Sequence, residues 1–249
     1  MDIKNFKIAY LLPNLFTAGS IFLAILAIFA AYNGNFERAF WYIVVSAVFD
    51  ALDGRVARLT NTASQFGKEF DSLADSIAFG VAPAFILYFS VGKDYGKIGI
   101  LLTALFIIFG AVRLARFNII SATTEPNVFI GLPIPAAALF VTSSTLLQIE
   151  FSCGAFSEIA LLSASAVIAI LMVSNIRYPS FKQIDFGKNR FRKVLLILIV
   201  VLSLFYLYPM KFLFAIALIY VLIGLVRAVW VTTYKKRKAH HAENNNQDI

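Results

Sequence analysis

The sequence predicts an all-α protein, a polytopic transmembrane bundle of about eight helices with both termini in the cytoplasm. Of its 249 residues, 60% are hydrophobic and the mean hydropathy is +0.79, whereas soluble domains are about 45–50% apolar. Surface-to-volume scaling limits the size of a protein core, so the surplus apolar residues must face lipid. Two further observations support this class: apolar runs long enough to span a bilayer, and basic residues gathered on alternate loops.

A spanning helix needs about 20 mostly apolar residues. The expected spans, in order, are 12–32, 37–58, 69–91, 96–117, 131–149, 156–174, 192–209 and 211–234. Lys4 and Lys7 precede the first run, which is long enough to span and lacks a small-residue cleavage site, so we expect a helix and not a signal peptide. Asn33–Asn35 supplies the turn before the second span.

The later spans are bounded or bent by proline. Pro83 lies inside the third expected span and should kink it, which membrane helices tolerate. Pro179 falls in the loop after the sixth span, and Pro209 ends the seventh. We expect one catalytic membrane domain over 1–238, followed by a polar, disordered tail over 239–249.

Basic residues set the expected orientation. With a cytoplasmic N-terminus, 18 of the 22 Lys and Arg residues fall on the cytoplasmic side of an eight-span topology. The run Lys235–Lys238 directly follows an apolar stretch, which favours contact with anionic membrane lipid and argues against nucleic acid as a partner. We therefore expect a multi-pass protein of the inner (cytoplasmic) membrane.

Four aspartates stand out because ionisable residues in membrane segments are costly and usually functional. Asp50 and Asp53 lie near the end of the second expected span, and Asp71 and Asp75 lie near the start of the third. The spacings i, i+3 and i, i+4 place each pair on one helical face. The two helices should form a hairpin in which all four carboxylates converge at the cytoplasmic end.

Four carboxylates in a confined site need a counter-charge. Oxygen-only ligands suit a hard cation such as Mg²⁺, Mn²⁺ or Ca²⁺, and four of them can hold two ions that clamp a phosphoryl group. Gly54 and Gly67 allow close approach of a ligand, and Arg58 adds a partner for phosphate. The alternative, aspartates paired with arginines at a membrane interface, explains a single aspartate but not four with two glycines on two faces.

These residues match the pattern D-x2-D-G-x2-A-R-x8-G-x3-D-x3-D, with eight fixed positions in 26 residues. The pattern resembles the signature of the CDP-alcohol phosphotransferase family. Within that family the chain is most similar to bacterial, membrane-embedded members that use serine. Further resemblance lies in Leu12–Thr17, Arg113–Asn118 and Gly131–Ala136, and it covers roughly residues 5–180.

The resemblance implies transfer of a phosphatidyl group from CDP-diacylglycerol to serine, which yields phosphatidylserine and CMP, by a homodimer. Asp50, Asp53, Asp71 and Asp75 would bind two divalent cations, with Asp75 also the general base. The residues near the CDP-lipid would be Asn14, Thr17, Gly54, Ala57, Arg58, Ser64 and Gly67.

The sequence constrains the identity of the acceptor alcohol less than it constrains the metal site. Arg113 and Arg116 end the fourth expected span, with Asn118 beside them, and an arginine pair can hold the carboxylate of serine. Both arginines are also explained as cytoplasmic anchors. A sister enzyme that uses glycerol 3-phosphate or inositol shares the metal motif. A cation transporter is the more distant alternative, although its ion site would lie near the bilayer midplane and not at one end of the helices.

Overall fold

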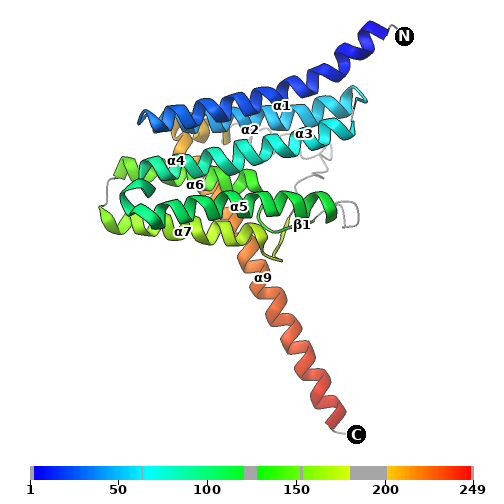
Figure 1. Cartoon of the computed structure of the whole chain (residues 1–249). Helices are drawn as coiled ribbons and strands as arrows, with labels where there is room; N and C mark the ends of the chain where they lie inside the picture. Colours follow the sequence, from blue (N-terminus) through cyan, green and yellow to red (C-terminus); the bar gives the residue numbers. More distant parts are fainter. Residues whose placement is uncertain (1–2, 63, 121–127, 152–153, 180–200, 248–249) are drawn as a thin grey trace.

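The structure is a computed structural model that describes residues 3–62, 64–120, 128–151, 154–179 and 201–247. It is a bundle of long helices that lie side by side (Figure 1). The elements, in chain order, are α1 (Ile3–Tyr32), α2 (Phe36–Leu59), α3 (Gln65–Asp75), the π-helix η1 (Ser76–Val81), α4 (Ala82–Ser90), the 3₁₀-helix η2 (Gly92–Tyr95), α5 (Gly96–Ile120), β1 (Val128–Ile130), α6 (Ile134–Phe151), α7 (Ala155–Val173), β2 (Arg177–Pro179) and α9 (Pro209–Gln247). The all-α prediction is therefore confirmed.

Six helical segments of the described chain are long and apolar enough to cross a membrane. They are Leu11–Tyr32, Gln65–Ser90, Gly92–Ile119, Ile134–Phe151, Ala155–Val173 and Pro209–Ala228. The second expected span is also a helix, α2, but its charged residues keep it out of this set. The seventh, 192–209, lies partly outside the described residues, of which 201–207 are helical. The protein is thus a multi-pass membrane protein.

Small side chains bring α1 and α2 together. Ala24, Ala27 and Ala39 are fully buried, and the Ser20 and Ser46 hydroxyls lie 2.7 Å apart between the helices. Small residues let helix backbones approach closely in lipid, where packing replaces the hydrophobic drive. This contact fixes how far the C-terminal half of α2 lies from α1, and hence the position of the aspartates that α2 carries.

The third expected span begins earlier than predicted and is continuous from α3 through η1 to α4. The π-helical turn follows Asp75 directly, and Pro83 comes just after it, at the start of α4. Proline lacks an N–H and cannot complete the α-helical ladder, so a wider turn before it absorbs the disruption. The expected kink is therefore a π-helical segment next to the acidic site.

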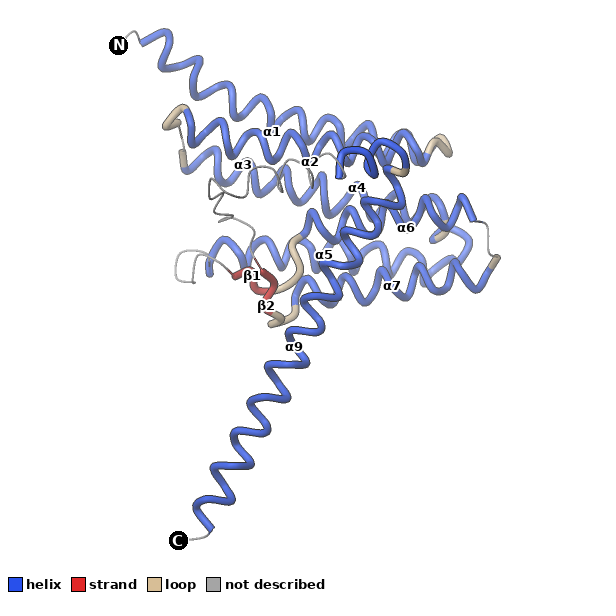
Figure 2. Tube along the Cα trace, turned by 180° about the vertical axis from the view of Figure 1, so that it is seen from behind, coloured by secondary structure: helices blue, strands red, loops and turns tan. Residues whose placement is uncertain are grey.

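A two-stranded antiparallel sheet, which the sequence does not predict, closes the same end of the bundle. β1 pairs with β2 so that Phe129 faces Tyr178 (Figure 2). Gly131 follows β1 with a φ of 80°, and a Cβ there would overlap the Met172 carbonyl oxygen. Its N–H donates to the Ile176 carbonyl at 2.8 Å. The chain before α6 is thereby fixed to the chain after α7.

α9 packs against α6 and then projects away from the bundle (Figure 1). Lys211, at its start, forms a 3.0 Å ion pair with Glu150, at the end of α6. The helix continues to Gln247, whereas we expected a disordered tail over 239–249. The lysine, arginine, alanine and glutamate residues within 235–243 are good helix formers, so a helix already begun at Pro209 extends through them.

Candidate active site

The aspartates of α2 and α3 converge at one end of the bundle. One carboxylate oxygen from each of Asp50, Asp53 and Asp71 lies within 4.8 Å of the others. The hairpin of α2 and α3 therefore brings its carboxylates together as the spacing predicts. Asp75 contacts the Asp50 side chain in hydrogen-bonding geometry and lies one helical turn beyond Asp71.

This group of oxygens suits a hard divalent cation. Asp53 is only 5% exposed, and the Oδ1 atom of Asp71 is buried without a hydrogen-bond partner among the described residues. A buried carboxylate oxygen without a partner is costly, and a divalent cation is the ligand that several such oxygens prefer. The residues present therefore fit a metal site at this position.

Thr17 of α1 holds one of these carboxylates in place. Its buried hydroxyl donates to Oδ2 of Asp53 at 2.8 Å and lies 3.1 Å from the Pro13 carbonyl oxygen. We expected Thr17 near the nucleotide; the structure places it at the pocket wall, in contact with a carboxylate of the acidic group. An outer hydrogen bond of this kind fixes the orientation of a metal ligand.

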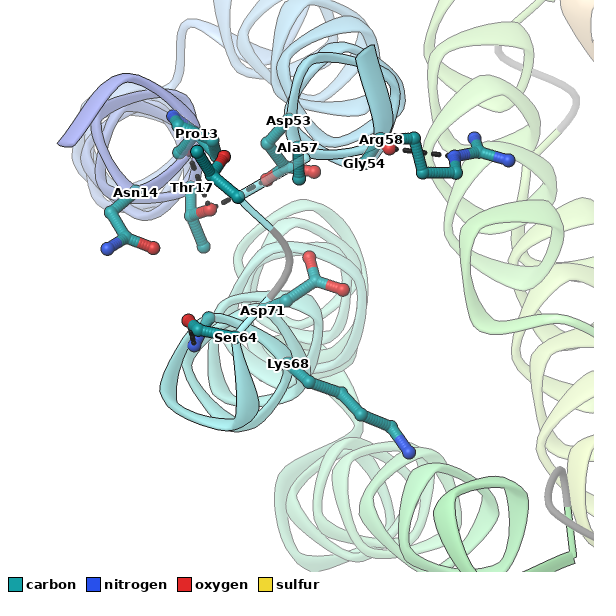
Figure 3. A pocket seen from close by; sticks show the side chains of 12 residues that line it. Pro13, Asn14, Thr17, Asp53, Gly54, Ala57, Arg58, Ser64, Lys68 and Asp71 are labelled. Carbon is teal, nitrogen blue, oxygen red and sulfur yellow. Dashed lines mark hydrogen bonds between the residues drawn. The ribbon is translucent and has the colours of Figure 1, made fainter. Parts of the chain in front are cut away.

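Next to the acidic group is a cavity of about 220 Å³. Its lining contains all seven residues that the resemblance assigns to the CDP-lipid, together with Asp53 and Asp71: Asn14, Thr17, Gly54, Ala57, Arg58, Ser64 and Gly67. In Figure 3, Thr17, Asp53 and Asp71 point toward one another from α1, α2 and α3. Residues 50 positions apart thus meet in one pocket that opens beside the carboxylates.

Three further lining residues were not predicted: Pro13, Thr62 and Lys68. Lys68 brings a positive charge to the pocket. Its position three residues before Asp71 places both on the same side of α3, and this was the signal that could have identified it. With Arg58, the pocket has two cations beside three neighbouring carboxylates.

The backbone at the pocket is shaped for a ligand. A Cβ at Gly54 would meet no atom within 4 Å, so this glycine leaves open space, whereas Gly67 lies close to the Asn14 side chain. Ser64 caps α3 by accepting the Gly67 N–H at 3.0 Å. Arg58 donates through Nε to the Gly54 carbonyl at 2.8 Å. The first turn of α3 therefore lines the pocket, where the partial positive charge of a helix N-terminus favours an anion.

The predicted acceptor residues of α5 separate into different environments. Arg113 is 6% exposed, lies within electrostatic reach of Asp75, and stacks over the Phe117 ring at 5.1 Å. Arg116 donates to the Val173 carbonyl at 2.9 Å and to the Asn175 side chain, so it fastens α5 to the end of α7. Asn118 donates to Ser72 Oγ at 2.9 Å, which ties α5 to α3.

A family model described as CDP-alcohol phosphatidyltransferase matches residues 10–176. This segment includes every element that contributes to the pocket. The chain belongs to the CDP-alcohol phosphatidyltransferase family. The match ends before α9, so that helix lies outside the part of the chain that the family model describes.

Three relatives within the CDP-alcohol phosphatidyltransferase family have names that contain serine. The chain is 49% identical over 219 residues to a CDP-diacylglycerol–serine O-phosphatidyltransferase of Helicobacter pylori, covering 88% of this chain and 91% of the relative. It is 35% identical over 181 residues to an archaetidylserine synthase of Methanothermobacter thermautotrophicus, covering 72% and 74%. A Bacillus subtilis protein with the same name as the first is 34% identical over 172 residues, covering 69% and 92%.

Proposed function

We propose that this chain transfers the phosphatidyl group of CDP-diacylglycerol to serine, forming phosphatidylserine and CMP. The observation that carries this proposal is the convergence of the motif: six of its eight positions line one pocket, and Asp50 and Asp75 lie beside it in the group of carboxylates. High identity along most of the chain to a serine O-phosphatidyltransferase supports serine as the acceptor and diacylglycerol as the lipid. A sister enzyme that uses glycerol 3-phosphate or inositol would have the same metal motif, but the relatives reported above are named for serine.

The donor binds through its polar end. Arg58 and Lys68 supply positive charge to the diphosphate, and the N-terminus of α3 adds partial charge of the same sign. The open space above Gly54 admits the nucleotide beside Asn14. The acyl chains stay in the bilayer, since the pocket lies at the ends of membrane helices.

Asp50, Asp53, Asp71 and Asp75 are the residues that would hold two divalent cations, Mg²⁺ or Mn²⁺. When bound, the cations supply positive charge to the diphosphate and to the departing CMP. Asp75 receives the proton of the serine hydroxyl, whose oxygen forms a new ester bond to the phosphorus that carries diacylglycerol. The anhydride bond to CMP breaks, and CMP leaves with the bridging oxygen. A base within reach is needed because a hydroxyl is a weak nucleophile at neutral pH.

Arg113 is the best-supported acceptor residue. Its buried guanidinium lies near Asp75, and its Nε has no hydrogen-bond partner in the part of the chain that the structure describes. A carboxylate on the acceptor can use that N–H while its hydroxyl faces Asp75. Asn118 is held next to α3 by its hydrogen bond to Ser72. Arg116 remains a predicted acceptor contact, although two of its N–H groups bind the chain at the end of α7.

We infer that the reaction takes place at the cytoplasmic face of the inner membrane. The distribution of 18 of 22 basic residues supports this orientation, since Arg58, Lys68, Arg113 and Arg116 share the end of the bundle that carries the site. A homodimer follows from the family resemblance, and residues 1–238 form the proposed catalytic domain.

Serine dependence tests the proposal. Purified protein in detergent with Mn²⁺ or Mg²⁺ should release CMP from CDP-diacylglycerol only after serine is added. Parallel reactions with glycerol 3-phosphate and inositol serve as controls. CMP release with either of these in place of serine would reassign the acceptor. Protein that releases no CMP with any acceptor, yet carries Mn²⁺ across vesicle membranes, would support a transporter.

Thr17→Val should weaken metal binding without removing a metal ligand. The substitution deletes the hydroxyl that holds Asp53 Oδ2 and keeps the side-chain shape, so we expect about 10–100-fold lower Mn²⁺ affinity. Electron paramagnetic resonance of free Mn²⁺ measures the affinity directly. Excess Mn²⁺ should recover most of the CMP release.

Thr103→Val is the matched control for Thr17→Val. Thr103 is also a buried threonine in a membrane helix, but its hydroxyl donates to the Gly99 carbonyl of its own helix. Its Mn²⁺ affinity should equal that of the wild type. Equal affinities in the two variants would show that the Thr17 hydroxyl does not support the metal site.

A further inference from the structure

α9 lies outside the segment matched by the family model, yet one of its side chains reaches the neighbourhood of the site. Tyr220, in the first third of α9, is within electrostatic reach of the Arg113 guanidinium. A chain of contacts through Phe117, Phe129 and Tyr178 also joins the two residues. Arg113 is in turn within reach of Asp75. One residue, the buried Arg113, thus separates Tyr220 of α9 from Asp75, the proposed general base.

Tyr220 is itself fixed by a second tyrosine. Its ring lies against that of Tyr178 on β2, with centroids 5.5 Å apart and planes tilted by 32°. Tyr178 is completely buried, and its hydroxyl has no hydrogen-bond partner among the residues described. Burial raises the pKa of Tyr178 to about 12, so its hydroxyl stays protonated at neutral pH. The ring of Tyr178 is therefore a neutral, enclosed surface against which Tyr220 packs.

The backbone of α9 packs closely against the ring of Tyr178. A Cβ at Gly224 would overlap the ring atoms of Tyr178, so only glycine allows this approach. Tyr178 cannot easily move aside, because β2 is paired with β1 and the ring is enclosed. The β1–β2 sheet therefore sets the position of α9, and α9 sets the position of Tyr220.

Arg113 needs such support. A guanidinium that is 94% buried is costly unless surrounding groups compensate its charge. Phe117 covers one face of the group, Asp75 lies to one side, and the Tyr220 hydroxyl presents an oxygen nearby. The Nε atom remains without a partner in the described chain, which leaves an N–H available to a ligand.

We propose that Tyr220 is a positioning residue for Arg113, and that α9 thereby completes the acceptor site for an amino acid carboxylate. The inference rests on the proposed function, because it assumes that Arg113 meets the carboxylate of serine. Tyr220 acts through Arg113 and does not touch the reacting atoms. Its loss should weaken serine binding selectively and leave the donor pocket, built from α1, α2 and α3, unchanged.

Tyr220→Phe tests the inference, because it removes the hydroxyl and keeps the ring stacked on Tyr178. The KM for serine should rise about tenfold, as expected when a polar group beside a buried charge is lost. The KM for CDP-diacylglycerol and the thermal unfolding midpoint should stay near wild-type values. Preference for serine over 2-aminoethanol, which lacks the carboxylate, should fall because only serine depends on Arg113.

Two comparison variants sharpen the result. Tyr208→Phe removes an exposed hydroxyl just before α9 and should behave as wild type. Gly224→Ala keeps Tyr220 but forces α9 away from Tyr178, so it should raise the KM for serine in the same direction.

An unchanged serine KM in Tyr220→Phe, or an equal loss for both substrates and both acceptors, would overturn the positioning role. Failure of the wild-type protein to release CMP in response to serine would instead reject the proposed function, whatever Tyr220 does.

Discussion

Asp75→Asn is expected to lower serine-dependent CMP release by about 10²–10⁴-fold, the range typical of a lost general base. Asparagine has nearly the same shape as aspartate but cannot accept the proton of the serine hydroxyl. The donor pocket should be spared, because Asp75 is not among its lining residues. Single-turnover CMP release, measured beside CDP binding by calorimetry, separates the lost chemistry from retained binding.

The control for this variant is Asp94→Asn. Asp94 is an exposed aspartate in η2, between α4 and α5. Its substitution should leave the rate unchanged. A near-normal rate in Asp75→Asn would assign proton transfer to another group, and Asp50, which contacts Asp75, would be the next candidate.

Local spacing was enough to predict the centre of this site. The intervals between Asp50 and Asp53, and between Asp71 and Asp75, fix helical faces, and the short connection between α2 and α3 forces those faces together. The seven residues that the resemblance assigns to the donor line the pocket for the same reason, since five of them lie on this hairpin and Asn14 and Thr17 lie at the same end of α1. Apolar length likewise predicted the spanning helices, because lipid leaves the backbone few alternatives.

Other features depend on contacts that the sequence pattern does not reveal. β1 pairs with β2 across nearly 50 residues, and three-residue strands carry too little alternation to be recognised. The π-helix after Asp75 leaves no mark in composition, because it differs from an α-helix only in its hydrogen bonds. Tyr220 comes near Arg113 only because α9 is held against β2 at one position, set by the contact of Gly224 with Tyr178.

The separation of Arg113 from Arg116 has the same origin. The two residues are three positions apart and look equivalent as a pair of cationic ligands. In the folded chain, one is buried near Asp75, while the other reaches the end of α7. Rotation of α5 about its axis decides between these environments, and the packing of α5 against α7 fixes that rotation.

Asp71→Ala is expected to abolish both metal binding and turnover. It removes a carboxylate from the group of three whose oxygens lie within 4.8 Å of one another, including the buried Oδ1 that lacks a protein partner. Loss of charge stabilisation worth several kcal/mol corresponds to a fall of about 10³-fold or more in CMP release. Mn²⁺ titration followed by electron paramagnetic resonance should show fewer bound ions, and chelation of the wild-type protein should reproduce the loss of turnover.

Glu69→Ala provides the matched control, since Glu69 is an exposed acid on the same helix whose side chain accepts a hydrogen bond from Gln65. It should bind Mn²⁺ and turn over normally. Compared with Asp75→Asn, the expected pattern is asymmetric. Asp71→Ala loses metal and rate together, whereas Asp75→Asn loses mainly rate because the close group of Asp50, Asp53 and Asp71 stays intact. Full Mn²⁺ binding by Asp71→Ala would contradict the metal site. If metal were instead lost only in Asp75→Asn, the cation site would have to lie farther along α3, next to Asp50 and Asp75. Asp71 would then be the candidate for proton transfer.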